Sequence, residues 1–389
     1  MIMEKMILDK VKDMPPSGIR KYFDMINEME NVISLGVGEP DFVTPWNVVE
    51  AGIYSLEKGH THYSSNAGFI ELRREISNYM NRRYNLSYRP EDEILVTVGG
   101  SEGIDLALRA LVGPGDEVII PEPSFVAYKG CTAFTGATAK IINLKAENDF
   151  KLMPDMLREA ITPKTKVVIL PFPNNPTGAI MTREELEKIV DVLKDKDIVI
   201  LSDEIYSELS YDKKHVSIAS FPEVKDKTLV INGFSKAYAM TGWRLGYACG
   251  NKVLIDAMKK IHQYAIMCSP TTAQYAAIEA LKNGDDSVRD MAKEYNRRIR
   301  VLVDGFRKMG IECFEPLGAL YVFPCIKSTG MTSDEFCEKL LMEEKVLTVP
   351  GNAFGECGEG FIRACYAASM DDLIEAIKRI NRFIENNKK

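Results

Sequence analysis

Residues 167–206 read VVILPFPNNPTGAIMTREELEKIVDVLKDKDIVILSDEIY, and this stretch decides the fold. Its two nearly continuous apolar runs, Val167–Leu170 and Ile198–Ser202, are typical of strands buried on both faces of a parallel sheet. Between them, Glu184–Leu193 has the spacing of an amphipathic helix, and Thr182 with Glu185 forms a capping box at its start. A strand, a helix and a second strand in this order predict a βαβ unit with parallel strands.

The same alternation extends in both directions along the chain. Further apolar runs alternate with helical segments such as Ile104–Val112, which the turn Gly113–Asp116 separates from the next run. These runs are Glu93–Val98, Glu117–Ile120, Lys140–Leu144, Thr228–Asn232 and Leu245–Cys249. The rhythm predicts an α/β fold in which helices cover both faces of a mostly parallel, doubly wound sheet.

The pattern changes after about residue 285, where a long charged amphipathic segment, Asp286–Met309, precedes shorter elements. The expected strands there are Ile311–Phe314, Leu320–Phe323 and Phe361–Cys365, and the expected helices are Ser333–Glu343 and Met370–Asn386. We therefore expect an N-terminal arm at residues 1–40, a large domain at 41–285 and a small α+β domain at 286–389 that includes part of the arm. The turn residues Pro15–Gly18 favour the arm over a strand.

The composition of the 389-residue chain argues against several classes of function. Its 49 basic and 56 acidic residues give a net charge of −7, and no cluster of Lys and Arg supplies the basic surface that nucleic-acid binding needs. The apolar runs are far shorter than the ~20 residues that span a bilayer. The charged start Met1–Lys5 lacks the apolar stretch of a signal peptide, so we expect a cytoplasmic protein. From the charge and the short apolar runs, we expect neither nucleic-acid nor membrane partners.

The eight cysteines and four histidines show no metal-binding spacing. The sequence contains neither a CxxC pair nor an HExxH motif. We therefore expect reduced, mostly buried cysteines and no metal site.

Polar residues follow several predicted strands at their carboxyl ends, where open α/β sheets bind ligands. The glycines of Gly99–Gly103 would let backbone amides at a helix start approach an anion. The Asn174–Gly178 loop, Asp203 and the Ser235–Lys236 pair follow other strands. A lysine that forms an imine with an aldehyde, an aspartate facing a ring nitrogen, and an arginine such as Arg244 near a phosphate are the parts of a pyridoxal-phosphate site.

Over essentially its whole length, the sequence resembles the class I and II aminotransferases of the fold-type I pyridoxal-phosphate family, within the aspartate- and aromatic-aminotransferase-like group. The motifs that carry the resemblance occur in the family's order. They are Leu35–Phe42, Asn174–Gly178, Ser202–Tyr206, Ser235–Lys236 with Gly242–Gly246, and Pro350–Arg363. The resemblance implies pyridoxal 5′-phosphate as the cofactor and residues 41–285 as the domain that binds it.

The resemblance also implies roles for individual residues around the cofactor. Lys236 would bind the cofactor through its amine and move the proton, and Asp203 would pair with the ring nitrogen. Asn175 and Tyr206 would contact the phenolic oxygen of the ring. Phe125 would stack on the ring face, where offset aromatic contacts are favourable.

Other residues would hold the phosphate and the substrate. Arg363 would bind the substrate α-carboxylate as a bidentate fork, with Gly38 and Asn175 beside the substrate. Tyr63 matches a tyrosine that reaches the phosphate of the neighbouring subunit, which implies a homodimer with shared sites. The phosphate contacts implied within one chain, the first three largely through the backbone, are Gly100, Ser101, Glu102, Ser235 and Arg244.

Two positions depart from the pattern of relatives. Gly233 stands where some relatives have a phosphate-binding serine, so we expect a lighter or rearranged phosphate shell there. Ser101 stands where one aspartate-using subgroup has a lysine that reads the side-chain carboxylate of the substrate. That feature of aspartate specificity is therefore missing from this chain.

The expected reaction is transfer of an amino group between an L-amino acid, aspartate or an aromatic one, and 2-oxoglutarate by a ping-pong mechanism. An acylated diaminopimelate as donor, a C–S β-lyase and a decarboxylase that use the same cofactor stay open as alternatives. A distant alternative is a serine hydrolase, because Gly99–Gly103 fits G-x-S-x-G and Asp203 precedes His215 and His262 in chain order. A transcription regulator would need a DNA-binding domain ahead of residue 40, for which we expect no room.

Overall fold

The computed structural model describes residues 6–12, 14 and 29–388. Half of the expected N-terminal arm, including the Pro15–Gly18 turn, lies outside the described residues. Within the described part, the short helix α1 (Asp9–Lys12) lies against α6 (Ala127–Thr135). There, Lys10 Nζ donates a hydrogen bond to the carbonyl of Phe134 at 2.6 Å.

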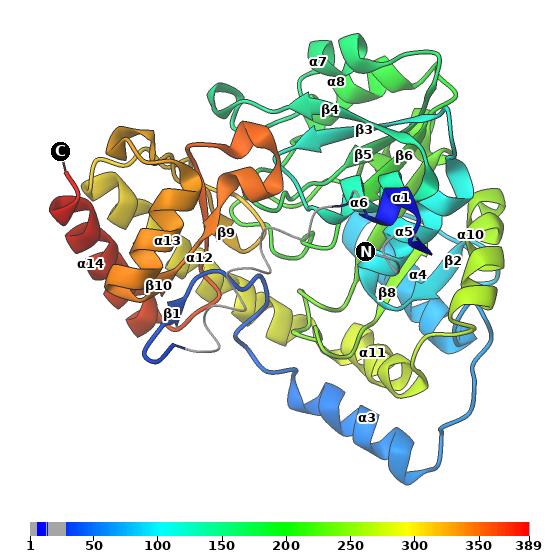
Figure 1. The fold of residues 1–389 in the computed structure, drawn as a ribbon. Helices are drawn as coiled ribbons and strands as arrows, with labels where there is room; N and C mark the ends of the chain where they lie inside the picture. The colour runs from blue at the N-terminus through cyan, green and yellow to red at the C-terminus, as the bar shows by residue number, and fades with distance from the viewer. Residues whose placement is uncertain (1–5, 13, 15–28, 389) are drawn as a thin grey trace.

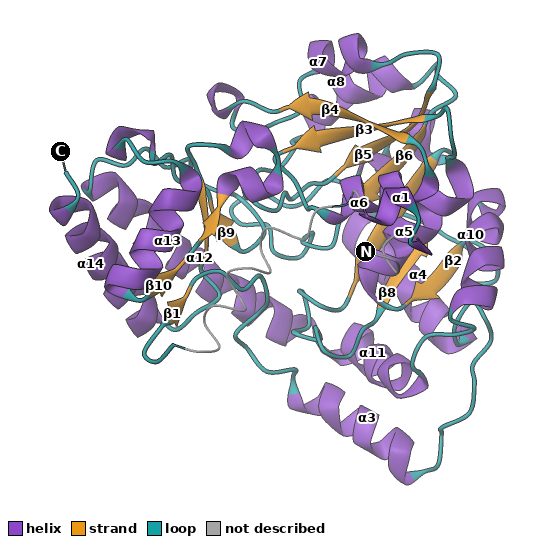
Figure 2. Cartoon of the chain, viewed as in Figure 1, coloured by secondary structure: helices purple, strands orange, loops and turns teal. Residues whose placement is uncertain are grey.

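A seven-stranded sheet occupies the centre of the larger part of the molecule (Figure 2). Its strand order is β2-β8-β7-β6-β5-β3-β4, and only β8 runs antiparallel to its neighbours. The strands are β2 (Ile94–Thr97), β3 (Glu117–Glu122), β4 (Thr138–Asn143), β5 (Thr165–Leu170), β6 (Val199–Asp203), β7 (Thr228–Gly233) and β8 (Gly246–Cys249). Each corresponds to one apolar run of the sequence, so the mostly parallel α/β sheet is confirmed.

Helices cover both faces of this sheet (Figure 1) because successive strand side chains point to opposite faces. Leu229 and Ile231 of β7 pack with side chains of α5, α6 and α10, whereas Val230 packs on the other face with side chains of α4 and α11. The helices of this part, besides α6, are α3 (Trp46–Glu57), α4 (Ile70–Tyr84), α5 (Gly99–Leu111), α7 (Pro154–Ala160), α8 (Arg183–Leu193), α9 (Pro222–Lys225), α10 (Lys252–Ala265) and α11 (Thr271–Asn283), with the 3-10 helices η2 (Ala146–Asn148) and η3 (Ile218–Ser220).

Helix α5 begins earlier than the sequence predicted. We expected a glycine loop at residues 99–103 followed by a helix, but the helix starts at Gly99 itself. The Glu102 side chain accepts a hydrogen bond from the backbone N–H of Val98 at 2.5 Å, which satisfies one amide at the helix start. The capping box expected at the start of α8 is confirmed, with the side chains and backbone amides of Thr182 and Glu185 bonded reciprocally.

The C-terminal part is built on a long helix and small sheets. α12 (Asp285–Lys308) is followed by a three-stranded antiparallel sheet of order β11-β12-β9 and a separate parallel pair, β1 with β10. The strands are β1 (Ile33–Ser34), β9 (Tyr321–Val322), β10 (Val346–Leu347), β11 (Val349–Pro350) and β12 (Ile362–Cys365). The helices are α13 (Ser333–Glu344) and α14 (Met370–Asn386), with the 3-10 helices η4 (Lys327–Thr329), η5 (Gly351–Phe354) and η6 (Glu356–Gly358).

One predicted strand of this part is wrong. Residues 311–314 form no strand, and Glu312 makes only an isolated bridge to Cys325. The predicted strand at 320–323 shrinks to the two residues of β9. Among the described residues, no helix is long and apolar enough to cross a membrane.

Candidate active site

A cavity of about 390 Å³ lies at the carboxyl ends of the central strands. Eleven of the predicted site residues line it, although they come from segments far apart in the sequence. They are Gly38, Gly100, Ser101, Phe125, Asn175, Asp203, Tyr206, Ser235, Lys236, Arg244 and Arg363.

Lys236 follows β7 and projects its amine into the cavity. Its Nζ donates a hydrogen bond to the backbone carbonyl of Gly38 at 2.6 Å. Burial lowers the pKa of Lys236 to about 8, and the guanidinium groups of Arg363 and Arg244 act in the same direction. About a tenth of the amine is therefore uncharged, and so nucleophilic, at pH 7, far more than for a lysine with its ordinary pKa.

Asp203 ends β6 and is only 7% exposed. Its Oδ2 accepts a hydrogen bond from Tyr128 Oη at 2.6 Å, and its Oδ1 accepts one from the backbone N–H of Ile205 at 3.2 Å. Burial raises the pKa of Asp203, while these two hydrogen bonds oppose the rise. Sequence reasoning missed Tyr128, although its place three residues after Phe125, one helical turn on, was an available signal.

Two tyrosines meet at another wall of the cavity. The hydroxyls of Tyr206 and Tyr321 are hydrogen-bonded at 2.7 Å. Burial raises the pKa of Tyr321 to about 12 and that of Tyr206 well above its ordinary value, so both hydroxyls keep their protons. A Cβ at Gly38 would lie 2.3 Å from Tyr321 Oη, so only glycine allows this close approach. Tyr321 was missed because β9, on which it lies, is brought to the cavity only by the tertiary fold.

Arg363 lies on β12 and is 3% exposed. Its guanidinium carbon lies 4.4 Å from the ring centroid of Tyr321 and 4.7 Å from that of Phe354. Nη1 donates to Asn175 Oδ1 at 3.0 Å and Nη2 to the carbonyl of Gly36 at 2.6 Å, but Nε has no hydrogen-bond partner among the described residues. Because a buried charged donor requires a partner, this arginine suits an anionic ligand such as a carboxylate.

The first turn of α5 and Arg244 form a corner of positive charge. Gly99 has a φ of +76°, and a Cβ there would lie 2.7 Å from Arg244 Nη2. Arg244 itself has a φ of +55°, a strained backbone conformation for an arginine, and its Nη1 donates to the carbonyl of Thr241 at 3.0 Å. The helix N-terminus adds a partial positive charge to that of the guanidinium, and Ser235 lines the same cavity.

Two predicted residues do not line the cavity. The Glu102 carboxylate turns back to the backbone N–H of Val98 and to His262 Nδ1, at 2.5 and 2.7 Å. Tyr63 is 79% exposed in the segment between α3 and α4. The role that the resemblance implies for Tyr63 concerns a neighbouring subunit, so this chain alone does not test it.

The hydrolase alternative finds no support in the geometry. Ser101 lines the cavity with Asp203, but His262 contacts Glu102 and His215 contacts Glu204. Among the described residues, no histidine lines the cavity, so a Ser-His-Asp triad does not form there.

Comparisons with known proteins point to one family. The chain matches the model of the family "Aminotransferase class I and II" over residues 30–380. It is 51% identical to "Putative aminotransferase YugH" of Bacillus subtilis, over 98% of this chain and 99% of that protein. It is 41% identical to the "Probable N-acetyl-LL-diaminopimelate aminotransferase" of Bacillus subtilis (98% and 96%) and 41% identical to the aspartate aminotransferase of Pyrococcus abyssi (98% and 98%).

A solved structure shares the fold closely. The aromatic aminotransferase from Pyrococcus horikoshii superposes with a TM-score of 0.90 at 39% identity, covering 95% of this chain and 99% of that one.

Proposed function

This chain belongs to the class I and II aminotransferases, and from that membership we propose that it transfers an amino group between an aromatic L-amino acid or aspartate and 2-oxoglutarate. Enzymes of this class are transaminases of fold type I that use pyridoxal 5′-phosphate. When bound, this cofactor supplies an aldehyde that accepts the amino group and a ring that withdraws electrons from the substrate α-carbon.

The residues that line the cavity fit this cofactor. A buried lysine with a pKa of about 8 suits the aldehyde, and the buried carboxylate of Asp203 suits a cationic ring nitrogen. The corner formed by Gly99 and Arg244 suits the phosphate. We assign Lys236 to binding the cofactor and then to moving the proton at the α-carbon, and Asp203 to keeping the ring nitrogen protonated.

The observation that carries the proposal is Arg363. A guanidinium that is 3% exposed, flanked by two aromatic rings and left with an unpaired Nε, is prepared for a planar anion. We assign it to the α-carboxylate that the amino acid and the 2-oxo acid share. Asn175, which accepts from Arg363 Nη1, would then orient the guanidinium beside the cofactor.

The charges in the cavity bear on the side chain of the donor. Among the described residues, the basic side chains that line the cavity are Lys236, Arg244 and Arg363, and the proposal uses all three. The cavity also has Glu39 at its wall, whose carboxylate repels an acidic side chain. An acidic donor would therefore need a cation from elsewhere, such as a second subunit, whereas an aromatic donor would not. We propose an aromatic amino acid as the better donor.

A donor screen tests the proposal. The enzyme loaded with pyridoxal phosphate is given 2-oxoglutarate and each of phenylalanine, tyrosine, aspartate and an N-acylated diaminopimelate, and glutamate formation is measured. We expect glutamate to form, with the highest kcat/KM for an aromatic donor. Absence of glutamate with every donor would contradict transamination. A cysteine conjugate that yields pyruvate and a thiol without glutamate would indicate the β-lyase instead.

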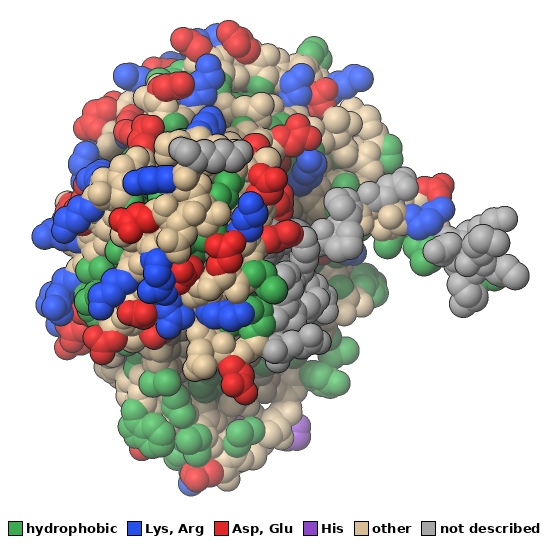
Figure 3. Space-filling model, turned by 60° about the vertical axis from the view of Figure 1, so that its left-hand side comes forward, with side chains coloured by type: hydrophobic (Ala, Val, Ile, Leu, Met, Phe, Trp, Pro, Cys, Tyr) green, Lys and Arg blue, Asp and Glu red, His purple; other side chains and the backbone are tan. Residues whose placement is uncertain are grey.

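We also propose a homodimer that shares its sites. Large apolar side chains are exposed on and near α3, and Figure 3 shows hydrophobic side chains gathered at the lower end of the molecule, where Figure 1 places this helix. Exposed apolar patches of this kind mark interaction surfaces. The exposed members include Val43, Trp46, Tyr54, Leu56 and Tyr63.

A further inference from the structure

The first turn of α5, to which the proposed function assigns the cofactor phosphate, has little stiffness of its own. Gly99, Gly100 and Gly103 are three of the first five residues of the helix. Glycine loses more conformational freedom than any other residue when it enters a helix. At Gly99 the missing Cβ is needed, because it would lie 2.7 Å from Arg244 Nη2. The glycines open this corner to a ligand, so contacts from other residues must hold the turn in place.

Glu102, in the same turn, makes two such contacts. Its Oε2 accepts a hydrogen bond from the backbone N–H of Val98 at 2.5 Å, and its Oε1 lies 2.7 Å from His262 Nδ1. Because an ionised carboxylate only accepts hydrogen bonds, Nδ1 carries the proton and donates it. The Glu102 carboxylate thus joins the backbone at the start of α5 to the last turn of α10, where His262 lies.

His262 is held in a rigid part of the fold. Its side chain is 0% exposed, and α10 packs along α5, with Met258 of α10 and Leu108 of α5 in one buried apolar cluster. The Nε2 atom of His262 has no hydrogen-bond partner among the described residues. The hydrogen bond recorded for the ring is therefore the one that it gives to Glu102.

This contact affects the amides that face the cavity. The first four N–H groups of an α-helix have no partner within the helix, and the Glu102 side chain satisfies that of Val98. The next amides include those of Gly100 and Ser101, two residues that line the cavity. A phosphate needs such amides in a fixed arrangement, because hydrogen bonds weaken steeply when their geometry is poor. A displaced helix start would therefore bind a phosphate less well.

We propose that His262 and Glu102 are positioning residues for the cofactor phosphate: their hydrogen bond ties the start of α5 to α10 and holds the amides of the first turn in the geometry that a phosphate requires. The inference rests on the proposed function, which assigns the phosphate to this corner. Neither residue lines the cavity, so both act through the backbone of α5.

The test compares the binding of two aldehydes, pyridoxal 5′-phosphate and pyridoxal, which differ in the phosphate group. The apoprotein is titrated with each aldehyde at one pH, and binding is followed by absorbance. Both aldehydes meet the same lysine and the same ring contacts, so the protonation of Lys236 affects both dissociation constants alike. The ratio of the two constants, compared between variants, therefore reports the phosphate contacts.

Loss of the hydrogen bond should reduce the preference for the phosphorylated aldehyde. In His262→Leu, which lacks the donor, we expect this preference to fall by about fivefold or more, within the range for one lost hydrogen bond. His262→Asn keeps an amide N–H near the position of Nδ1 and should recover most of the preference. A preference in His262→Leu equal to that of the wild type overturns the inference.

Glu102→Gln separates positioning from a simple effect of charge. The glutamine oxygen replaces only one of the two carboxylate acceptors, so we expect the preference for the phosphorylated aldehyde to fall. Removal of a negative charge near an anion would by itself strengthen phosphate binding. A preference that rises or stays the same in Glu102→Gln therefore overturns the inference. Because glutamine has nearly the size of glutamate, this variant also decides the matter if His262→Leu does not fold.

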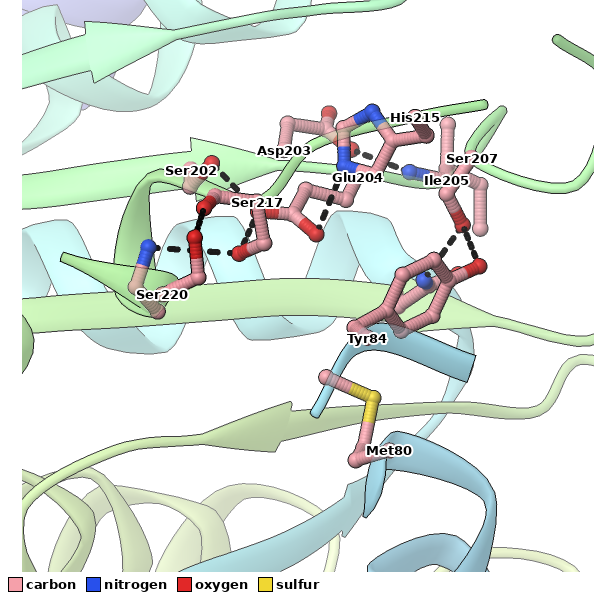
Figure 4. Close-up of polar contacts among 12 residues, drawn as sticks. Met80, Tyr84, Ser202, Asp203, Glu204, Ile205, Ser207, His215, Ser217 and Ser220 are labelled. Carbon is pink, nitrogen blue, oxygen red and sulfur yellow. Dashed lines mark hydrogen bonds and ion pairs between the residues drawn. The ribbon is translucent and has the colours of Figure 1, made fainter. Parts of the chain in front are cut away.

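His215→Leu is the matched control. His215 is also a buried imidazole beside a buried carboxylate, with its Nε2 2.9 Å from Glu204 Oε2 (Figure 4). It packs against Tyr84 of α4 and does not line the cavity, so its loss should leave the ratio unchanged even if the protein is less stable. Equal losses of preference in His215→Leu and His262→Leu overturn the inference. A wild type that binds neither aldehyde contradicts the proposed function instead.

Discussion

The chemistry of the cavity depends on a few side chains whose burial changes their protonation. Lys236 is the clearest case, because desolvation disfavours its charged form and lowers its pKa to about 8. The uncharged amine is the form that attacks an aldehyde, and its fraction rises as the pH increases through the pKa. The rate at which the apoprotein captures pyridoxal phosphate should therefore rise with pH with a midpoint near 8. Stopped-flow absorbance checks this, and a midpoint near the ordinary lysine value of about 10.4 would contradict it.

Arg363 offers a second test at the residue scale. Arg363→Ala should lower kcat/KM for both the amino acid and 2-oxoglutarate, because both carry the α-carboxylate. Loss of a desolvated bidentate partner costs about 2–5 kcal/mol, or roughly 30- to 5,000-fold in kcat/KM. Arg363→Lys should recover only part of this, since an ammonium lacks two parallel donors.

The matched control for Arg363 is Arg289→Ala, which removes an exposed ion pair with Asp286 on α12. Its kcat/KM for both substrates should stay within twofold of that of the wild type. If Arg363→Ala folds and binds the cofactor, and its kcat/KM for both substrates also stays within twofold of the wild-type value, the carboxylate-binding role of Arg363 is excluded.

At the scale of elements, the start of α5 depends on its contact with β8. A Cβ at Gly246 would lie 2.6 Å from the backbone N of Gly100 and 2.6 Å from the backbone C of Gly99, and backbone atoms cannot rotate away. Gly246→Ala should therefore push the first turn of α5 outward, weaken binding of pyridoxal phosphate and destabilise the fold by about 1–3 kcal/mol. Denaturant unfolding and a cofactor titration measure the two effects.

The control for this prediction is Gly113→Ala, where a Cβ would meet nothing within 4 Å. Equal stability and cofactor affinity in the two alanine variants would show that the contact between β8 and α5 does not position the anion site.

Some strands and helices of the fold could be predicted from the sequence, and others could not. The seven strands of the central sheet were predictable because strands buried on both faces are continuous apolar runs. The strands β1, β10 and β11 have two residues each and depend on partners distant in sequence, so no local pattern marks them. The helical state of Gly99–Gly103 was missed because glycine has low helix propensity, and here a cap from Glu102 and packing against β8 override that preference.

Part of the candidate site could be predicted from the order of the strands. Lys236, Asp203 and Asn175 follow strands of one sheet, so parallel topology brings them to one edge. Tyr321 reaches the same cavity from β9, and His262 contacts Glu102 from α10, so neither could be placed without the tertiary structure. The roles of all these residues, and the division into domains near residue 285, stay predictions.

At the scale of the whole molecule, the proposed dimer makes a prediction about assembly. Trp46→Glu places a charge in the exposed apolar patch near α3 and should convert a dimer into a monomer of 43.7 kDa. Activity should fall with it, because Tyr63 would no longer reach a second site. Sedimentation velocity measures the mass, and Met342→Glu, at an exposed position of α13, serves as the control that stays dimeric. A fully active wild-type monomer would contradict the shared site.

The central claim is that this chain binds pyridoxal phosphate through Lys236 as an aminotransferase. The most direct measurement is borohydride reduction of the cofactor-loaded enzyme, which makes a lysine–cofactor link permanent, followed by digestion and mass spectrometry. We predict one modified peptide, with the cofactor on Lys236, and no modification in enzyme first incubated with a donor amino acid in the absence of 2-oxo acid. A cofactor found on another lysine, or on none, would contradict the account.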